Sequence, residues 1–157
     1  MLNHFKNFKK YAFRLELLQE YNIPNERKHF IKFLKTKIYT PSTNSEWIKL
    51  IKSANKRKAK ISRVHVIELP LSDYLKFEIR YYKINKNAGE QVFLLNKDKF
   101  KKIKPNIKSD FWLFDDEIVL KMKYDKQGRF LGYKEIKRDI QKYIDLKNKL
   151  LKIAKKK

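Results

Sequence analysis

The sequence predicts a single α+β domain spanning residues 1–157, built as an antiparallel sheet of about five strands with helices packed on one side and a long C-terminal helix. The length of 157 residues suits one domain. Runs with period two alternate with runs whose apolar residues recur three and four positions apart, which is typical of strands mixed with amphipathic helices. Apolar residues make up 42% of the chain and aromatic residues 14%, which is enough to build a core despite the charge.

The N-terminal segment predicts a short helix followed by a strand. Residues 4–12 carry their aromatic side chains on one helical stripe. Residues 13–17 then alternate apolar and charged side chains, which predicts a half-buried strand with Arg14 and Glu16 on one face. A continuous helix to residue 20 is the alternative.

Two helices are expected before the next strand. One begins at Pro24, with Asn25 as its N-cap. Pro41 then interrupts the chain. The spacing of Thr43 and Glu46 matches a capping box, so a further helix is expected to follow it.

The middle of the chain alternates strand and helix. Residues 61–69 are rich in Val and Ile, which favours a strand. Ser72 is the expected N-cap of the helix that follows, and Gly89 is expected at its C-terminal end. Residues 75–81 also alternate apolar and charged side chains, so a strand is the alternative there. Residues 90–95 predict the next strand.

The C-terminal part predicts one helical turn, a three-stranded meander and a helix. The turn is expected over residues 98–102, and the strands over 110–114, 118–124 and 130–135, with antiparallel pairing across the final turn. The last element is a helix of about 19 residues over 136–154, predicted by a continuous apolar stripe.

The composition excludes several kinds of chemistry. The chain has no Cys, which excludes disulfides, Cys-ligated zinc and thiol nucleophiles. With three Gly it contains no phosphate-binding loop or dinucleotide motif. His4, His29 and His65 show no metal-binding spacing, so we predict no metal ion and no cofactor. His65, on a strand beside Arg63, is the histidine we single out.

The sequence also predicts where the protein works. No apolar run approaches the about 18 residues of a membrane span. Residues 1–10 lack the apolar core of a signal peptide. The helical apolar faces are needed for the core, which disfavours a membrane-surface role. We therefore expect a cytoplasmic protein without a membrane partner.

The net charge of +23 is the strongest sign of a partner. A surface this basic attracts polyanions. Lys supplies 33 of the 40 basic residues, and Lys acts as a point charge where Arg makes bidentate contacts. Any nucleic-acid binding is therefore predicted to be sequence-independent and salt-sensitive. Codon bias in an AT-rich genome is the alternative origin of the lysines.

Two basic helix faces are the candidate nucleic-acid-binding surfaces, because exposed lysine rows suit phosphate backbones. One lies in the middle of the chain and one on the C-terminal helix. The first comprises Lys49, Lys52, Lys56, Arg57 and Lys60. The second comprises Lys142, Lys149 and Lys152.

Several phrases of the chain resemble one known family in the same order. They are Ala12 to Glu16 with Tyr21, Pro24 and Glu26; Arg63 to Val66; Pro70 to Tyr74; Asn85 with Ala88 to Glu90; and Asp110 to Asp116. Together they resemble a bacterial, mainly actinobacterial, domain-of-unknown-function family, number 6879, over roughly residues 5–135. The resemblance implies a common fold and no known reaction. Similarity to small proteins found near helix-turn-helix regulators implies a regulatory or toxin–antitoxin setting. Members of the family look acidic, so the charge of this chain is not a family feature.

The same phrases set charged residues among apolar ones, where burial is costly unless the charges are paired. Five charged residues form a candidate catalytic cluster: Arg14, Glu16, Arg63, Glu78 and Glu90. Such groups act either as an acid/base pair or as carboxylate ligands for a divalent metal ion. A structural ion-pair network is the alternative. Convergence in an open cleft favours an enzyme, and convergence in a sealed core favours the network.

Three functions follow as hypotheses. The first is a non-enzymatic nucleic-acid-binding or regulatory protein of a prokaryote or mobile element, which contacts the phosphate backbone through its lysines. The second is a toxin-like hydrolase that acts on nucleic acid through a Glu/Arg cleft. The third is a protein-interaction module, in which the acidic segment 110–117 docks against a basic partner.

Overall fold

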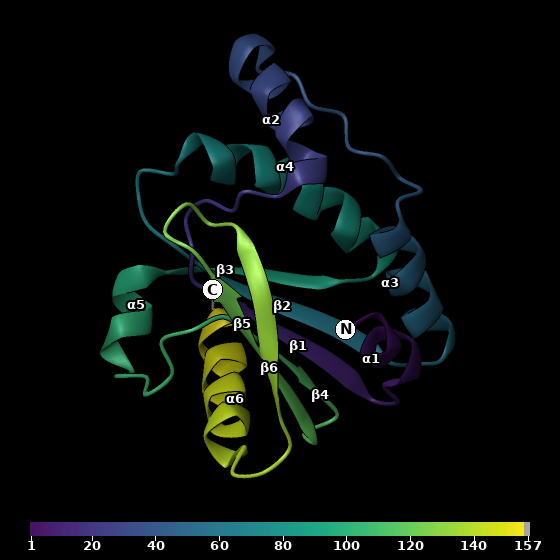
Figure 1. Ribbon diagram of the computed structural model, residues 1–157, viewed down its shortest axis with the longest axis vertical. Coiled ribbons are helices and arrows are strands. Elements are labelled where there is room, and N and C mark those ends of the chain that lie inside the picture. The colour runs from purple at the N-terminus through teal and green to yellow at the C-terminus, as the bar shows by residue number, and fades with distance from the viewer. Residues whose placement is uncertain (156–157) are drawn as a thin grey trace.

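Residues 1–155, which the computed structural model describes, form one mixed six-stranded sheet with helices on both faces (Figure 1). The helices are α1 (Leu2–Asn7), α2 (Pro24–Thr36), α3 (Glu46–Lys56), α4 (Asp73–Ala88), α5 (Lys97–Lys102) and α6 (Gln141–Lys155). The strands are β1 (Tyr11–Glu16), β2 (Lys60–Ile67), β3 (Gln91–Asn96), β4 (Phe111–Phe114), β5 (Ile118–Tyr124) and β6 (Phe130–Ile136). The predicted α+β class is confirmed.

The strands lie in the order β3-β2-β1-β4-β5-β6. The pairs β1–β4, β4–β5 and β5–β6 are antiparallel, as expected, while β1–β2 and β2–β3 are parallel. Parallel neighbours need a long crossover connection. The segment with α2 and α3 supplies one crossover and α4 supplies the other. The sheet is therefore mixed, and β3 and β6 are its edges.

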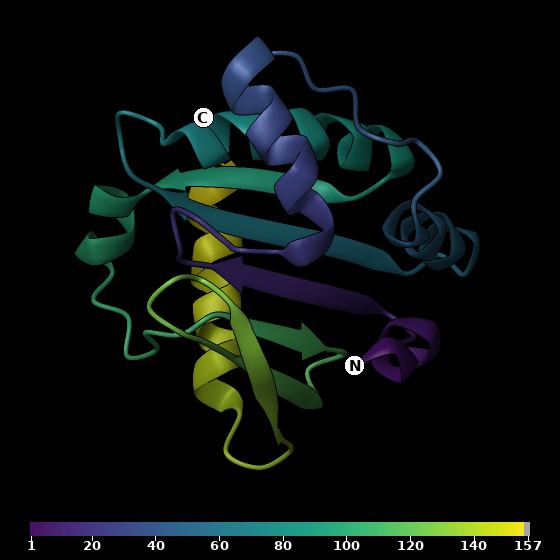
Figure 2. The same cartoon turned by 45° about the horizontal axis from the view of Figure 1, so that its top comes forward.

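Helices cover both faces of the sheet, which corrects the expectation that they pack on one side. Phe13 and Leu15 belong to the cluster that packs against α6. Their neighbour Ala12 belongs to the cluster that packs against α1 and α3. Figure 2 shows α6 on the opposite side of the sheet from α2. The physical reason is that both faces are apolar: all four residues of β4 are buried.

The predicted start and end of α4 are confirmed, which excludes a strand over residues 75–81. Ser72 Oγ accepts a hydrogen bond from the backbone N–H of Leu75, and Gly89 ends the helix with a φ of 116°. At α3, Ser45 rather than Thr43 caps the helix, since its Oγ accepts from the N–H of Ile48.

The other helix boundaries differ from the predictions by a few residues. α2 begins at Pro24 with Ile23 at the N-cap position, so Asn25 is not its cap. Proline suits the first helical position because the missing N–H would have no intrahelical partner there. α6 begins at Gln141 rather than at residue 136, because β6 extends to Ile136 and a bend follows it. No helix within residues 1–155 is long and apolar enough to cross a membrane.

Replacing Gly89 with alanine is expected to destabilise the protein by about 1–2 kcal/mol, because L residues rarely adopt its backbone conformation. A Cβ there also meets Asn55, whose side chain donates to the carbonyl of Ala88 at 2.7 Å. Urea unfolding measures the loss. Gly132→Ala is the matched control, because its φ is +126° and a Cβ meets nothing within 4 Å. An equal loss at both positions would show that the contact with Asn55 contributes nothing.

Candidate functional site

The five predicted catalytic residues converge on the face of the sheet that α3 and α4 cover. Because strand residues alternate between faces, Arg14 and Glu16 of β1 share this face with Arg63 of β2. Glu78 reaches it from α4, and Glu90 reaches it from the residue before β3. Three further buried side chains lie beside them: His65, Tyr82 and Asp110. We call the whole set the polar network: Arg14, Glu16, Arg63, His65, Glu78, Tyr82, Glu90 and Asp110.

Arg63 connects two of the carboxylates. Its Nη1 donates to Glu16 Oε1 and its Nε donates to Glu90 Oε1, both at 2.8 Å. Glu90 also accepts from Trp47 Nε1 at 3.1 Å. Burial alone would lower the pKa of Arg63, but the charges of Glu16 and Glu90 raise it well above its ordinary value. The guanidinium is therefore charged and held from two sides.

Arg14 forms the second ion-pair centre. Its Nη2 donates to Asp110 Oδ2 at 3.1 Å and to Tyr124 Oη at 2.8 Å, and its Nε lies 3.4 Å from Glu16 Oε1. Asp110 also accepts from the N–H of Leu17 and the hydroxyl of Tyr21. Burial alone would raise the pKa of Glu16, but Arg63 and then Arg14 lower it well below its usual range.

The third centre joins β1, β2 and α4 around His65. Its Nδ1 lies 2.8 Å from Tyr82 Oη and 3.5 Å from one carboxylate oxygen each of Glu16 and Glu78. Tyr82 Oη donates to Glu16 Oε2 at 2.8 Å. Glu78 Oε2 is buried and has no hydrogen-bond partner among the described residues. Burial, and then the charge of Glu16, raise the pKa of Glu78 well above its ordinary value.

The polar network is sealed in the core. Each member is 9% exposed or less. A buried charge of this kind is stable only when it is paired and hydrogen-bonded. Of its members, Tyr82 and Glu90 line a surface groove, but each is only 3% exposed, so the geometry favours a structural network over a hydrolase cleft. Tyr82 could have been added to the predicted cluster from the sequence. It follows Glu78 by four residues, and residues at this spacing share one face of a helix.

The predicted basic face around α3 is exposed at three of its lysines, whereas Arg57 makes contacts within the fold. Lys52, Lys56 and Lys60 are exposed, while Lys49 pairs with Glu46 at 2.8 Å. Arg57 instead clamps the N-terminal segment. Its Nη2 donates to the carbonyls of Phe5 and Phe8, and its guanidinium lies 5.2 Å from the Phe8 ring centre.

The two predicted basic faces do not form one surface. Lys142, Lys149 and Lys152 of α6 are exposed. However, α6 packs on one face of the sheet and α3 packs on the other. A straight polyanion therefore cannot lie along both rows at once.

The acidic segment over residues 110–117 is only partly exposed: Glu117 lies at the surface, and three other acids make contacts within the fold. Asp110 is buried in the polar network. Asp115 accepts hydrogen bonds from the backbone N–H groups of Lys9, Lys10 and Tyr11. Asp116 pairs with Lys147 at 2.9 Å. Asp115 therefore holds the N-terminal segment through backbone hydrogen bonds, and Asp110 forms a buried ion pair with Arg14.

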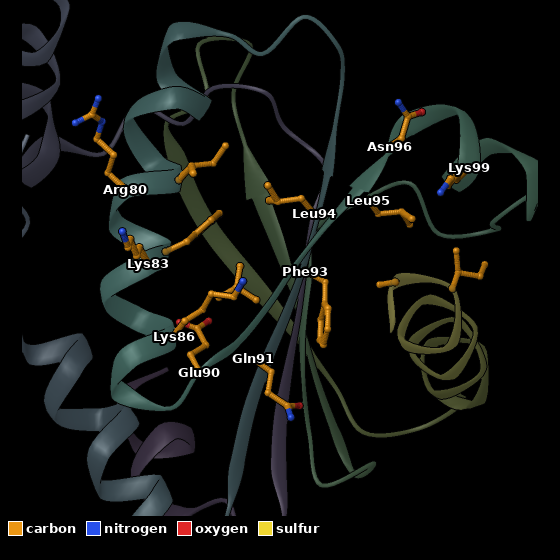
Figure 3. A pocket seen from close by; sticks show the side chains of 15 residues that line it. Arg80, Lys83, Lys86, Glu90, Gln91, Phe93, Leu94, Leu95, Asn96 and Lys99 are labelled. Carbon is orange, nitrogen blue, oxygen red and sulfur yellow. The ribbon is translucent and has the colours of Figure 1, made fainter. Parts of the chain in front are cut away.

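A groove of about 890 Å³ runs along the free edge of β3, between α4 and the ends of α5 and α6 (Figure 3). Its floor is aliphatic and includes Leu94, which is 40% exposed. Four exposed cationic residues belong to the two helices beside it: Arg80, Lys83 and Lys86 of α4 and Lys99 of α5. The Arg80 side chain points away from the groove, and its guanidinium lies 5.2 Å from the ring centre of Phe33 (Figure 3). No salt bridge within residues 1–155 involves these four residues. None of these four residues was among the predicted nucleic-acid-binding residues.

Fold and site together define an α+β protein with an ion-pair network sealed under its helices and a basic groove at one sheet edge. The chain belongs to the family described as a domain of unknown function (DUF6879), whose model matches residues 1–155. The family resemblance noted from the sequence is thereby confirmed. A search of curated proteins finds no match. The family description assigns no reaction, so the function has to be argued from the geometry.

Proposed function

We propose that this protein is a non-enzymatic, sequence-independent nucleic-acid-binding protein with a regulatory role. The observation that carries the proposal is the row of cationic side chains along the β3 groove, which no acidic residue of the described chain neutralises. Such side chains attract phosphate groups and release counterions when they bind them. The exposed lysines of α3 and α6 add to the field that draws a polyanion to the surface.

The aromatic side chains support backbone contacts rather than base contacts. Stacking on unpaired bases needs exposed rings. Trp112 is 6% exposed and Phe114 is 3% exposed, since both pack between the sheet and α1. Phe93, which lines the groove, is only partly exposed. The lysines beside the groove suit the phosphate backbone.

Binding is expected to weaken steeply with salt and to depend most on the groove lysines. Each phosphate contact with duplex DNA contributes about 0.9 to the slope of log affinity against log salt. The triple variant Lys83→Gln, Lys86→Gln and Lys99→Gln should therefore reduce that slope by about 2–3. Fluorescence anisotropy with labelled DNA of unrelated sequences, as duplexes and as single strands, measures both affinity and slope.

Two control variants remove the same number of charges from other surfaces. One carries Lys52→Gln, Lys56→Gln and Lys60→Gln, and the other carries Lys142→Gln, Lys149→Gln and Lys152→Gln. Both should reduce the slope less than the groove variant does. Equal losses from all three variants would assign the binding to net charge alone. Undetectable binding of the unmodified protein at about 50 mM salt would refute the proposal.

A further inference from the structure

Three side chains from distant parts of the sequence meet with the geometry of a metal site. They are Glu16 of β1, His65 of β2 and Glu78 of α4. One carboxylate oxygen of each glutamate and one ring nitrogen of the histidine all lie within 4.8 Å of one another. All three residues are buried.

The orientation of the histidine ring favours metal binding. His65 Nε2 lies 2.7 Å from the backbone carbonyl oxygen of Leu18. A carbonyl only accepts, so Nε2 is assigned as the donor, and the lone pair of the neutral ring is then on Nδ1. Nδ1 faces Glu16 and Glu78 at 3.5 Å each. A backbone carbonyl behind the distal nitrogen is the usual support of a metal-binding histidine.

The centre of this cluster has too few hydrogen-bond donors. Tyr82 carries one hydroxyl proton, yet its Oη lies 2.8 Å from both His65 Nδ1 and Glu16 Oε2. Glu78 Oε2, in a residue that is 7% exposed, has no donor among residues 1–155. When Glu78 is ionised, one proton therefore faces three acceptor atoms. Buried acceptors without a partner are costly and call for an explanation such as a bound ion.

The charge balance also calls for a cation. The polar network contains four carboxyl groups, those of Glu16, Glu78, Glu90 and Asp110. Arg14 and Arg63 supply two positive charges. Fully ionised, the network therefore carries an excess of two negative charges. A divalent cation beside Glu16 and Glu78 neutralises that excess, whereas without a cation the raised pKa of Glu78 favours its protonated form.

We propose that the protein binds one divalent metal ion at this cluster, with His65 Nδ1, Glu16 Oε2 and Glu78 Oε2 as ligands, and that the ion is Zn²⁺. Tetrahedral zinc with bonds of about 2.0–2.1 Å sets its ligand atoms about 3.3 Å apart. The two separations of 3.5 Å from His65 Nδ1 fit this geometry after a small contraction, and the two glutamate oxygens, which lie within 4.8 Å of each other, would move together when the ion binds. Tyr82 Oη lies 2.8 Å from both His65 Nδ1 and Glu16 Oε2, so it is close enough to be the fourth ligand. Magnesium is a poorer fit, because it prefers oxygen ligands and retains several waters.

The sealed position makes this a structural site that fills as the chain folds. A closed set of protein ligands is typical of structural zinc. Binding and folding are then coupled, because the ligands come together only in the folded state. The inference is independent of nucleic-acid binding, since none of the three ligands lines the groove.

The test compares protein refolded with Zn²⁺ and with a chelator. We expect close to one equivalent of bound zinc after dialysis, and a higher thermal unfolding midpoint for the zinc-loaded protein. Glu78→Gln removes one ligand and keeps the shape of the side chain. It should weaken zinc binding by tenfold or more and remove the zinc-dependent rise in the midpoint. The metal-free variant should be as stable as the metal-free protein, because Glu78 Oε2 has no hydrogen bond to lose.

His4→Gln is the matched control, because His4 lies 3.1 Å from Glu135 at the surface and offers an alternative zinc site. This variant should keep full zinc binding. Loss of zinc binding in His4→Gln would overturn the proposal, as would unchanged binding in Glu78→Gln. Co²⁺ substitution tests it without a variant. Visible absorption typical of tetrahedral cobalt would support the site, and octahedral cobalt or no bound cobalt would overturn it.

Discussion

Replacing Arg63 with alanine is expected to lower the free energy of unfolding by about 3–5 kcal/mol. The guanidinium holds Glu16 and Glu90 through hydrogen bonds of 2.8 Å, and truncation leaves two carboxylates without their shared partner in the core. Its ring contacts are lost as well, since it lies 5.3 Å from the centre of Tyr82 and 5.9 Å from that of Trp112. The midpoint of thermal unfolding should fall by about 6–20 °C.

Two controls separate the loss of a charge partner from the loss of an arginine side chain. Arg129→Ala removes an exposed pair with Asp125 and should cost less than about 1 kcal/mol. Adding Glu90→Gln to Arg63→Ala should recover part of the loss, because it neutralises one orphaned carboxylate. If Arg63→Ala costs no more than Arg129→Ala, the polar network does not hold the sheet and α4 together.

The polar network also links the core to the groove. Tyr82 and Glu90 belong to the network and line the groove from beneath. Glu16 fixes Tyr82 of α4 by a hydrogen bond, and Arg63 fixes Glu90 at the start of β3. These two bonds set the positions of α4 and β3, which are the elements that border the groove. A core variant should therefore alter the groove even though it removes no surface charge.

The convergence of the polar network was predictable from the sequence because burial of charge has few solutions. Arg14 and Glu16 alternate with apolar residues, so they share one face of β1. In β2, Arg63 and His65 alternate with Val64 and Val66, so they also share one face. Opposite charges forced into one core must pair. Ser72 and Gly89 were equally informative, because a cap acts through bonds within a few residues of the chain.

The parallel strand pairing, the groove and the proposed metal site depend on contacts between segments that are far apart in the sequence. Parallel pairing of β1 with β2 is set by the crossover helices and not by any local pattern. The groove joins Lys83 and Lys99, which only the packing of α4 and α5 around β3 brings to one surface. The prediction that no metal binds rested on histidine spacing. Spacing carries no information about a site such as the one we propose, because Glu16 and His65 come from different strands.

Replacing Phe111 with alanine is the other change for which we expect an effect of about 3–5 kcal/mol. Phe111 is fully buried at the junction of the two halves of the sheet. It lies opposite Leu15 of β1 and Lys121 of β5 in the strand register. Its ring centre is 5.0 Å from that of Tyr143 on α6, so one side chain joins the parallel half, the meander and the covering helix.

Phe130→Ala is the matched control, because the same atoms are removed from a side chain that is 46% exposed on the edge strand β6. It should cost less than about 1 kcal/mol. Urea unfolding followed by far-UV and near-UV circular dichroism measures both variants and shows whether the sheet still unfolds in one transition. The four-residue strand β4 is the link between the halves. A cavity there should therefore weaken the whole sheet, and separate transitions of the two halves would contradict the single core.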